Sequence, residues 1–394
     1  MKSQTIIFLS NGYAEDNIAS CIIENLLQKD TALEIKVLPF VGEGAPYRKL
    51  KIKVLGPCKK MPSDGFIASN FFYFLKDLKA GWLKMYAGKV RSLKKESKKV
   101  RLVVCVGDIF LVLSSALFLR KPLIFIATAK SDYIKEHYLL EKWLMRRCCK
   151  LVFARDKKTA LSLRRYRINA VYVGNAMMDC LKITGEDFGV REGSTVVGIV
   201  PGSRKEAYEN LKVSLSAAEK IYLEGGKNFL FLLALAPSLD ARKIPSFLQE
   251  KKNWTVKDVT FQERKKGIVL HLVSKEGTLV KVVQGRFGDV VNLSRVVIGT
   301  AGMANEQAVG LGKPVVAFPG KGPQITEKFL RAQQKLLGGC VFIVKRNPQA
   351  IASRVLSIVK NYDELVRVAK VGKERMGEPG AASRMAELIY AELK

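Results

Sequence analysis

Two short apolar strands near residue 300 each run into a glycine-rich turn that is followed by a helix. The first strand ends at Ile298 and leads into the turn 299–302 and an expected helix over 304–311. The second strand, 315–318, leads into the turn 320–323 and a helix from Ile325. Consecutive strand–turn–helix units are typical of a doubly wound α/β domain, which binds ligands at the carboxyl ends of its parallel strands.

A glycine turn that opens a helix leaves backbone N–H groups pointing at one spot, with the positive helix end behind them. Two such turns on neighbouring strands fit a diphosphate. Glu306 lies in the first turn of the first helix, where its carboxylate can accept both hydroxyls of a ribose. The alternative is that both turns need glycine only for packing. The two turns together with Glu306 favour a nucleotide site.

The same alternation of strand, turn and helix recurs along the whole chain. Strand 195–200 runs into Pro201, Gly202, Ser203 and Arg204, which add a hydroxyl and a guanidinium to a third anion-type turn. The polar, glycine-bearing segment 182–194 resembles a linker. We therefore expect two doubly wound, Rossmann-like α/β domains facing across a cleft, which is the GT-B architecture. The predicted boundaries are an N-terminal acceptor-facing domain at 1–181, the linker at 182–194, a nucleotide-sugar domain at 195–375, and a terminal helix within 376–394 that packs back on the N-terminal domain.

The composition narrows the class of partner. The 394 residues carry a net charge of +31, which implies an anionic partner such as nucleic acid, a membrane surface or a phosphorylated substrate. Seven scattered cysteines without a CxxC or a Cys/His cluster fit reduced thiols in a cytosolic protein. We expect no signal peptide, and no segment reaches the roughly 20 uncharged apolar residues of a membrane span.

Three carboxylates follow strands of the predicted N-terminal domain and are candidate catalytic bases. Asp108 lies between the apolar runs 102–106 and 109–113, where apolar surroundings raise a carboxyl pKa and favour proton transfer. The alternative role of Asp108 is to cap a helix. Glu15 and Asp16 follow the first strand, 5–9, and either hold a sugar, act as a base, or favour the dipole of the next helix.

Residues 66–99 combine aromatic and basic side chains at unusual density. The apolar ones recur at helical spacing, and nine basic residues accompany only two acids, Asp77 and Glu96. This pattern predicts a helix at the interface of an anionic membrane, with an ordinary core helix as the alternative. The membrane-facing candidates are Phe71, Phe74, Leu75, Leu78, Trp82 and Tyr86, with Lys76, Lys79 and Lys84.

Several motifs together resemble a known family. The segments VGIVPGSRKEA and GTAGMANEQAVGLGKPVVAFPGKGPQITEKF look like the C-terminal domain of lipid-A-disaccharide synthase, and look closer still to the bacterial lipid-A-disaccharide synthase-related proteins. SNGYAED, GDIFLVL and VGNAMMD fall in the family's order, so the resemblance covers most of the chain.

The resemblance implies roles for individual residues. Asp108 matches the family's catalytic aspartate. Many relatives have histidine and glycine in the first loop, where this chain has Tyr13 and Ala14, so a histidine base is excluded there. That loop faces the acceptor and comprises Asn11, Gly12 and Tyr13. The donor would be bound by Ser203 and Arg204 at the diphosphate, the nucleotide turn Gly299, Thr300, Ala301 and Gly302, Glu306 at the ribose, and Gln324 at the sugar or diphosphate.

The implied activity is inverting glycosyl transfer from a UDP-sugar to a lipid-linked acceptor, catalysed by a peripheral protein on the cytoplasmic membrane face. No Asp-x-Asp motif occurs, so we expect neither a metal nor a cofactor besides the UDP-sugar co-substrate. The alternative is a UDP-sugar 2-epimerase of the same fold, which has no use for the aromatic and basic segment 66–99. Nucleic acid is not expected, because no base-stacking motif accompanies the positive charge. The oligomeric state stays open, with a homodimer among the alternatives.

Overall fold

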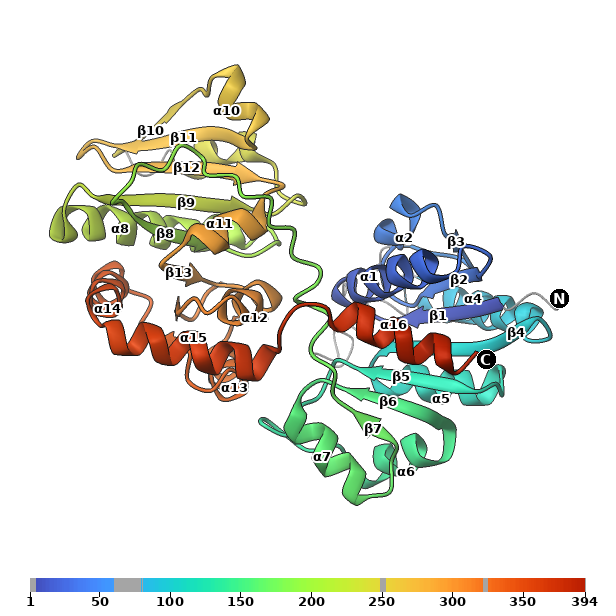
Figure 1. Ribbon diagram of the computed structural model, residues 1–394. Coiled ribbons are helices and arrows are strands. Elements are labelled where there is room, and N and C mark those ends of the chain that lie inside the picture. The colour runs from blue at the N-terminus through green and yellow to red at the C-terminus, as the bar shows by residue number, and fades with distance from the viewer. Residues whose placement is uncertain (1–4, 60–78, 80, 249–252, 322–324, 394) are drawn as a thin grey trace. The chain divides into compact units, whose positions relative to one another are not determined.

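The computed structural model describes residues 5–59, 79, 81–248, 253–321 and 325–393 (Figure 1). The chain forms two compact units. Unit 1 comprises Met1–Cys180 together with Glu378–Lys394, and unit 2 comprises Leu181–Gly377. The chain therefore returns to unit 1 for its last residues.

Unit 1 is built on a seven-stranded parallel sheet with the strand order β3-β2-β1-β4-β5-β6-β7. The chain proceeds outward from β1 to β3, crosses back to β4 and then proceeds outward on the other side. The order thus reverses between β1 and β4, where doubly wound sheets bind ligands. The strands are β1 Thr5–Ser10, β2 Glu34–Pro39, β3 Lys53–Val54, β4 Val100–Gly107, β5 Leu123–Ala127, β6 Cys149–Ala154 and β7 Ala170–Val171.

Helices cover both faces of this sheet. In Figure 1, α1 and α16 lie on one face and α4, α5 and α6 on the other, as right-handed crossovers require. The returning helix α16 is held at its start by Asp179, whose carboxylate accepts hydrogen bonds from the backbone N–H groups of Gly380 and Ala382. The helices are α1 Tyr13–Lys29, α2 Ala45–Lys49, α4 Trp82–Glu96, α5 Ile109–Phe118, α6 Leu139–Cys148, α7 Lys157–Arg165 and α16 Ala381–Ala391.

Unit 2 contains an eight-stranded sheet with the order β10-β11-β12-β9-β8-β13-β14-β15. Its six strands from β12 to β15 in this order are parallel, and β10 and β11 extend one edge in antiparallel fashion. The order reverses between β8 and β13. The strands are β8 Thr195–Val200, β9 Phe229–Leu235, β10 Trp254–Lys257, β11 Ile268–Ser274, β12 Leu279–Gln284, β13 Val296–Gly299, β14 Val315–Ala317 and β15 Val341–Ile343.

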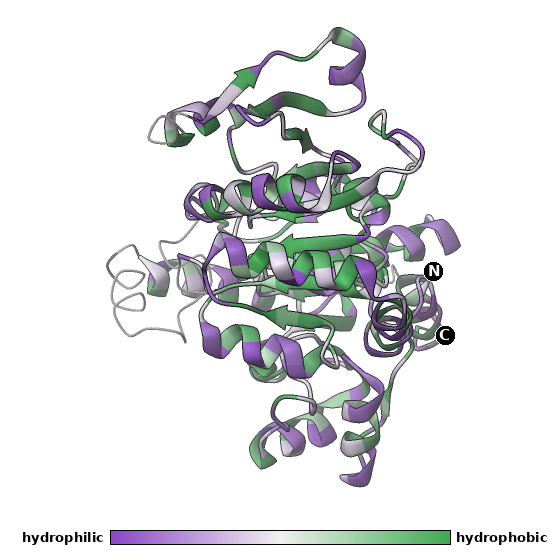
Figure 2. Cartoon of the chain, turned by 90° about the vertical axis from the view of Figure 1, so that its left-hand side faces the viewer, coloured by the Kyte–Doolittle hydropathy of each residue, from purple (hydrophilic) through white to green (hydrophobic). Residues whose placement is uncertain are grey.

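The helices of unit 2 follow most of these strands and complete its core. Figure 2 shows hydrophobic residues concentrated on the strands, and the buried cluster joins them to the inner faces of α8 and α14. The helical segments are α8 Ala207–Gly225, the 3₁₀ turn η2 Ala241–Lys243, α9 Ile244–Leu248, α10 Phe261–Lys265, α11 Phe287–Leu293, α12 Met303–Gly310, α13 Glu327–Leu336, α14 Pro348–Lys360 and α15 Tyr362–Met376.

The prediction of two doubly wound α/β domains is confirmed at the level of these two sheets. Some elements differ from the expected ones. Helix α1 begins at Tyr13, whereas the sequence predicts a helix over 17–28; the start is earlier because Gly12 is extended and the Asp16 N–H already bonds the Gly12 carbonyl. The short strand β10 and the helix α7 were not expected. Helix α7 is so rich in lysine and arginine that its apolar face is only a few residues wide.

Candidate active site

The point where β1 and β4 diverge is closely packed around Asn11 and Gly107. The backbone of Gly107 has φ +144°, and a Cβ there would lie 1.8 Å from the Asn11 side-chain oxygen. Only glycine therefore lets Asn11 lie across the end of β4. Asn11 in turn hydrogen-bonds the carboxylate of Asp108, the next residue along the chain.

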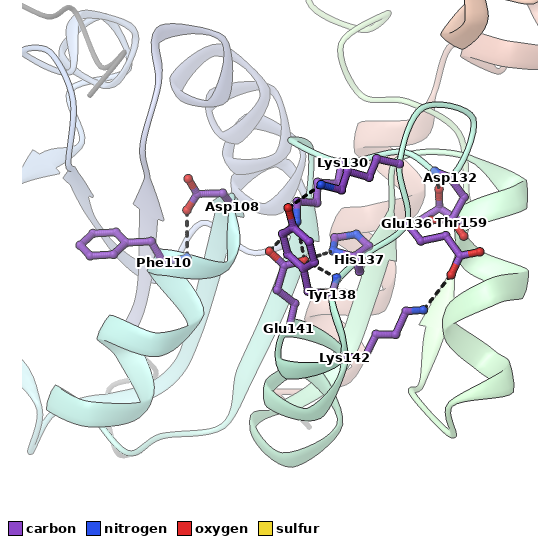
Figure 3. A network of polar contacts seen from close by, with 11 residues as sticks. Asp108, Phe110, Lys130, Asp132, Glu136, His137, Tyr138, Glu141, Lys142 and Thr159 are labelled. Carbon is purple, nitrogen blue, oxygen red and sulfur yellow. Dashed lines mark hydrogen bonds and ion pairs between the residues drawn. The ribbon is translucent and has the colours of Figure 1, made fainter. Parts of the chain in front are cut away.

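Asp108 caps α5 and also has a raised pKa. Its Oδ1 accepts a hydrogen bond of 2.9 Å from the backbone N–H of Phe110 (Figure 3). Burial raises the pKa of the Asp108 carboxyl, while the bonds from Phe110 and Asn11 lower it in part. The raised pKa predicted from the apolar flanks is confirmed, and so is the capping contact. One side chain thus combines both features that the sequence offered as alternatives.

Glu15 lies beside Asp108 at the same sheet edge. Its side chain folds back over Gly12, where an added Cβ would meet Glu15 Oε2 at 2.1 Å. The Thr128 hydroxyl, at the end of β5, donates a 2.9 Å hydrogen bond to Glu15 Oε1. Burial is the largest cause that raises the pKa of Glu15, and repulsion from Asp108 adds to it, while Arg155 opposes it. The first loop and β4 therefore bring two carboxylates close enough to interact.

Asp16 points into the core and not toward the loop surface. It is 0% exposed and accepts a 2.6 Å hydrogen bond from the Ser10 hydroxyl, which itself accepts one of 2.7 Å from Tyr47. Burial raises the pKa of Asp16 to about 7, with repulsion from Glu15 contributing and attraction to Lys89 opposing. In this conformation Asp16 supports the first loop from beneath, and its carboxylate is not exposed at the loop surface.

A polar network at the first turn of α6 lies close to Asp108. Lys130 donates two 2.7 Å hydrogen bonds to the carboxylate of Glu141, and His137 Nδ1 lies 3.2 Å from the same group (Figure 3). The charges of Glu141 and Lys130 shift the pKa of Asp108 upward and downward, respectively. Sequence reasoning did not select Lys130 or Glu141, because an i, i+11 pair across a loop has no periodic signature.

In unit 2, the turns after β8 and β13 are joined by Thr300. Its N–H bonds the Val200 carbonyl at 2.9 Å, and its hydroxyl donates to the Pro201 carbonyl at 3.0 Å. Gly202 has φ +106°, and a Cβ there would lie 3.1 Å from the Thr300 carbonyl oxygen. The turn with Ser203 and Arg204 and the turn Gly299–Gly302 therefore lie side by side at the reversal of strand order.

The turn after β13 is fixed by two amide side chains that the sequence did not single out. Asn305 donates to the Gly299 carbonyl at 3.3 Å and to Gln333 at 3.0 Å. Gln333, on α13, donates to the Gly302 carbonyl at 2.8 Å. Glu306 follows in the first turn of α12 and is buried. Ala301 is buried within the same turn. Buried amide side chains thus hold both ends of this turn.

The turn after β14 is held by Asn210, a residue of α8. The Lys321 N–H bonds Asn210 Oδ1 at 2.9 Å, and Arg346 reaches the same oxygen at 3.4 Å. A Cβ on Gly320 would lie 2.9 Å from the Asn210 side chain. Sequence reasoning missed Asn210 and Arg346. Gln324, the predicted sugar or diphosphate ligand in this turn, lies outside the described residues.

The predicted membrane segment is described only from its second half. Trp82 and Tyr86 stack with ring centroids 5.4 Å apart, and Tyr86 also lies 5.8 Å from Phe110 and 6.1 Å from Phe40. Lys79 and Lys84 are exposed. Phe71, Phe74, Leu75, Lys76 and Leu78 lie outside the described residues.

Two features are absent from the described part of the chain. None of its helices combines the length and the apolar character that a bilayer crossing requires. The same residues contain no group of three or more histidine, cysteine, aspartate or glutamate side chains arranged to hold a metal ion.

Known sequences place the chain near one group of enzymes. No family model matches it. It is 23% identical over 256 residues to a lipid-A-disaccharide synthase of Syntrophus aciditrophicus, covering 59% of this chain and 60% of that protein. It is 24% identical over 243 residues to a lipid-A-disaccharide synthase of Syntrophotalea carbinolica, covering 56% of each. The resemblance to this family is thus confirmed, and the chain spans less than two thirds of the curated relatives it matches.

Solved structures confirm the fold along almost the whole chain. CalG4, the calicheamicin glycosyltransferase, has a TM-score of 0.62 at 13% identity and covers 100% of this chain and 99% of its own. The UDP-GlcNAc 2-epimerase of Neisseria meningitidis bound to UDP-GlcNAc has a TM-score of 0.58 at 17% identity and covers 99% of each chain. The architecture is that of the two-domain, Rossmann-like GT-B fold.

Proposed function

We propose that this protein is an inverting, metal-independent glycosyltransferase that moves a sugar from a UDP-sugar to a lipid-linked acceptor. The observation that carries the proposal is the pairing of the turns after β8 and β13 through Thr300, with Glu306 in the helix that follows. The curated relatives named lipid-A-disaccharide synthase support the reaction class.

The donor diphosphate would lie against the backbone N–H groups of the turns at 201–204 and 299–302. Ser203 adds a hydroxyl donor and Arg204 a permanent positive charge. Glu306 would accept the ribose hydroxyls. These groups stabilise the negative charge that develops on UDP as it leaves, which is the task a divalent cation performs in metal-dependent transferases. Asn305, Gln333 and Asn210 would keep the turns in place without touching the donor.

Asp108 is the proposed general base. The acceptor hydroxyl oxygen forms a bond to the anomeric carbon while the bond from that carbon to the diphosphate oxygen breaks, and its electron pair leaves with UDP. The hydroxyl proton passes to the Asp108 carboxylate. A raised pKa suits this role because it makes the carboxylate a stronger base. Glu15 and the loop of Asn11, Gly12 and Tyr13 would hold the acceptor beside it.

A lipid-linked acceptor requires the protein to reach a membrane. The aromatic and basic segment 66–99 supports a peripheral position on the inner face of the cytoplasmic membrane, where anionic lipids attract lysine side chains. A second candidate function is a UDP-sugar 2-epimerase, which the likeness to the Neisseria epimerase fold favours.

One experiment separates the two. The protein is incubated with a panel of UDP-sugars, with and without a detergent-dispersed bacterial lipid extract, and all products are analysed by mass spectrometry and sugar-nucleotide chromatography. A new glycolipid together with free UDP, formed only when lipid is present, supports the transferase. An isomerised UDP-sugar formed without lipid supports the epimerase, and neither product with any donor contradicts both.

A further inference from the structure

A row of polar contacts crosses the carboxyl edge of the unit 1 sheet, over four strands that are neighbours in the order β1-β4-β5-β6. Arg155 follows β6, and its Nη1 donates a 2.7 Å hydrogen bond to the carbonyl of Thr128. Thr128 follows β5, and its hydroxyl donates a 2.9 Å hydrogen bond to Oε1 of Glu15, in the first turn of α1. We call Arg155, Thr128 and Glu15 the edge chain. Since β4 lies between β1 and β5, the edge chain spans the end of β4.

Thr128 uses its backbone as well as its side chain in this arrangement. Its N–H donates a 3.1 Å hydrogen bond to the carbonyl of Gly107, the residue before the proposed base Asp108. Its carbonyl accepts the bond from Arg155, and its hydroxyl donates to Glu15. One residue is therefore bonded both to the backbone beside Asp108 and to the carboxylate of Glu15. The position of Glu15 relative to Asp108 is thus set by groups that follow β5 and β6.

The edge chain also acts on the charge of Glu15. Burial is the largest cause that raises the pKa of the Glu15 carboxyl, and repulsion from Asp108 adds to it. The hydrogen bond from Thr128 and the charge of Arg155 both lower this pKa. The edge chain therefore favours the ionised form of Glu15, in which both carboxylate oxygens accept hydrogen bonds and neither donates one.

A purely structural role is the alternative for Arg155, because its guanidinium bonds a backbone carbonyl. Arg164 of α7 has a comparable contact, in which its Nε donates a 2.6 Å hydrogen bond to the Ala170 carbonyl. Two features distinguish Arg155. Its charge acts on Glu15, and it lines a cavity of unit 1 together with Thr128. A shortened side chain at either position would therefore enlarge a space that already exists.

We propose that Arg155 and Thr128 are positioning residues, which hold the Glu15 carboxylate beside Asp108. Glu15, held in this way, accepts a hydrogen bond from the bound acceptor and so turns the reacting hydroxyl toward the base. Neither positioning residue needs to touch the acceptor, because both act through Glu15. The inference rests on the proposed function, since it assigns these roles for the transfer reaction.

The first test measures glycolipid formation against pH, with the donor and lipid extract that give a product with the wild type. Arg155→Met and Thr128→Val keep much of the side-chain volume but remove the charge and the hydroxyl. We expect kcat/KM for the acceptor to fall about tenfold or more at neutral pH, because small displacements of a positioning group are costly. The acid limb of the profile should move to higher pH, because Glu15 then binds a proton more readily.

Matched variants separate this effect from a loss of structure. Arg155→Lys keeps the charge and Thr128→Ser keeps the hydroxyl, so both should retain most of the activity. Arg164→Met, which loses the bond to Ala170, should behave as the wild type does. Wild-type rates and an unmoved acid limb in both Arg155→Met and Thr128→Val would overturn the inference.

A double variant tests whether Arg155 acts through Glu15. Once Glu15→Gln has removed the carboxylate, adding Arg155→Met should slow the reaction little further, because the two residues act as a unit. Losses that multiply in the double variant would assign Arg155 a separate role and so contradict the edge chain.

The last test does not depend on activity. The pKa of Glu15 lies above its ordinary value of 4.5, so the folded state binds this proton more tightly than the unfolded state does. Stability therefore falls as pH rises from 4.5 toward the raised pKa, and Arg155→Met extends this fall to higher pH. The melting temperature of Arg155→Met should decrease relative to the wild type as pH rises from mildly acidic to neutral.

The same comparison in the Glu15→Gln background should give a difference that is independent of pH. Asp16 and Tyr47, two further titratable groups that interact with Glu15, are present in both members of each pair. A difference between Arg155→Met and wild type that does not depend on pH would overturn the inference. If no donor gives glycolipid but the pH-dependent difference appears and is lost with Glu15→Gln, the edge chain is supported and the proposed function alone fails.

Discussion

At the scale of single residues, three neighbouring carboxylates have three different environments. Asp108 caps a helix and stays partly exposed, Glu15 bonds Thr128, and Asp16 is sealed in the core by Ser10. Burial raises the pKa of all three. The partners of each acid, more than its own identity, therefore decide which can take a proton from a bound molecule.

The first prediction concerns the base. Asp108→Asn keeps the size of the side chain and an oxygen that caps α5, but cannot accept the proton. Turnover should fall about 100-fold or more, the usual scale of general-base catalysis. UDP binding and melting temperature should change little. Normal turnover in this variant, with loss of turnover in Glu15→Gln, would assign the base to the first loop.

The second prediction concerns the nucleotide. Glu306→Ala should weaken UDP binding by about 1–3 kcal/mol, the cost of losing a charged hydrogen bond. Calorimetry with UDP measures this directly. Glu327→Ala is a suitable control, because Glu327 also lies in the first turn of a helix but is exposed and pairs with Arg331. Equal UDP affinity in the two variants would refute the ribose contact.

The third prediction uses the pKa of Asp16, which burial raises from 3.8 to about 7. The folded state binds this proton more tightly than the unfolded state does, so the free energy of unfolding should decrease as pH rises between these values. Ser10, Tyr47, Glu15 and Lys89 surround the carboxyl, and Lys89, with a pKa lowered to about 8, is charged throughout that range.

Asp16→Asn removes the titrating group, so the free energy of unfolding of this variant should no longer decrease as pH rises. The melting temperatures of the two proteins are compared at mildly acidic and at neutral pH. The melting temperature of the variant should rise relative to that of the wild type as pH rises. Ser20→Ala, a substitution of another buried polar residue on α1, should leave the wild-type pH dependence in place. Parallel pH profiles for wild type and Asp16→Asn would show that Asp16 does not titrate in this way.

Sequence reasoning works at this scale where the signal is local. The position of Asp108 between two apolar runs offered a raised pKa and a helix cap as alternatives, and the structure contains both. The amides that fix the unit 2 turns could not be found in the same way. Asn305 bonds a residue 28 positions away, and Asn210 bonds one 111 positions away, so only the tertiary fold brings them together.

At the scale of elements, the alternation of strands and helices was predictable because the central strands are short apolar runs, and several of them are followed by a glycine-bearing turn. Helix α4 shows the limit of such patterns. Its lysines were all expected to lie on a polar face, yet Lys89 is buried and donates a 2.5 Å hydrogen bond to the Pro39 carbonyl. The hydrogen bond to this carbonyl holds the Lys89 ammonium inside the fold, and the spacing of residues along α4 does not predict it.

The fourth prediction concerns helix α16. Asp179 accepts hydrogen bonds from the Gly380 and Ala382 N–H groups and so caps this helix from a distant part of the sequence. Asp179→Ala should lower the free energy of unfolding by about 0.5–2 kcal/mol, the cost of losing an N-cap. Urea denaturation measures the change. Asp258→Ala, at an exposed position, should have little effect, and equal stability of the two variants would contradict the capping role.

At the scale of the whole molecule, the main feature is the large excess of basic over acidic residues. Lysine and arginine number 67 against 36 aspartate and glutamate residues. The two-unit fold was predictable because both halves repeat the same strand and helix pattern. The location of exposed apolar surface on α6 was not, because Leu139, Leu140 and Trp143 resemble core residues until their surroundings are known.

The fifth prediction follows from this charge. Binding of the wild type to mixed phosphatidylglycerol vesicles should weaken strongly as ionic strength rises from about 0.1 M to about 1 M, because the Debye length falls from about 10 Å to about 3 Å. Binding to pure phosphatidylcholine should be weaker and nearly independent of salt. Equal binding to both kinds of vesicle at low salt would show that electrostatic attraction does not contribute to vesicle binding.

The return of α16 to unit 1 has a consequence for how the protein is made. A ribosome completes all of unit 2 before it releases the residues of α16. Until then α1 lacks the helix that covers it, since Ala382, Met385 and Ile389 are buried only once α16 has docked. Unit 1 begins translation first but is finished last, so the nascent chain must keep an apolar helix face soluble while an entire second domain is synthesised.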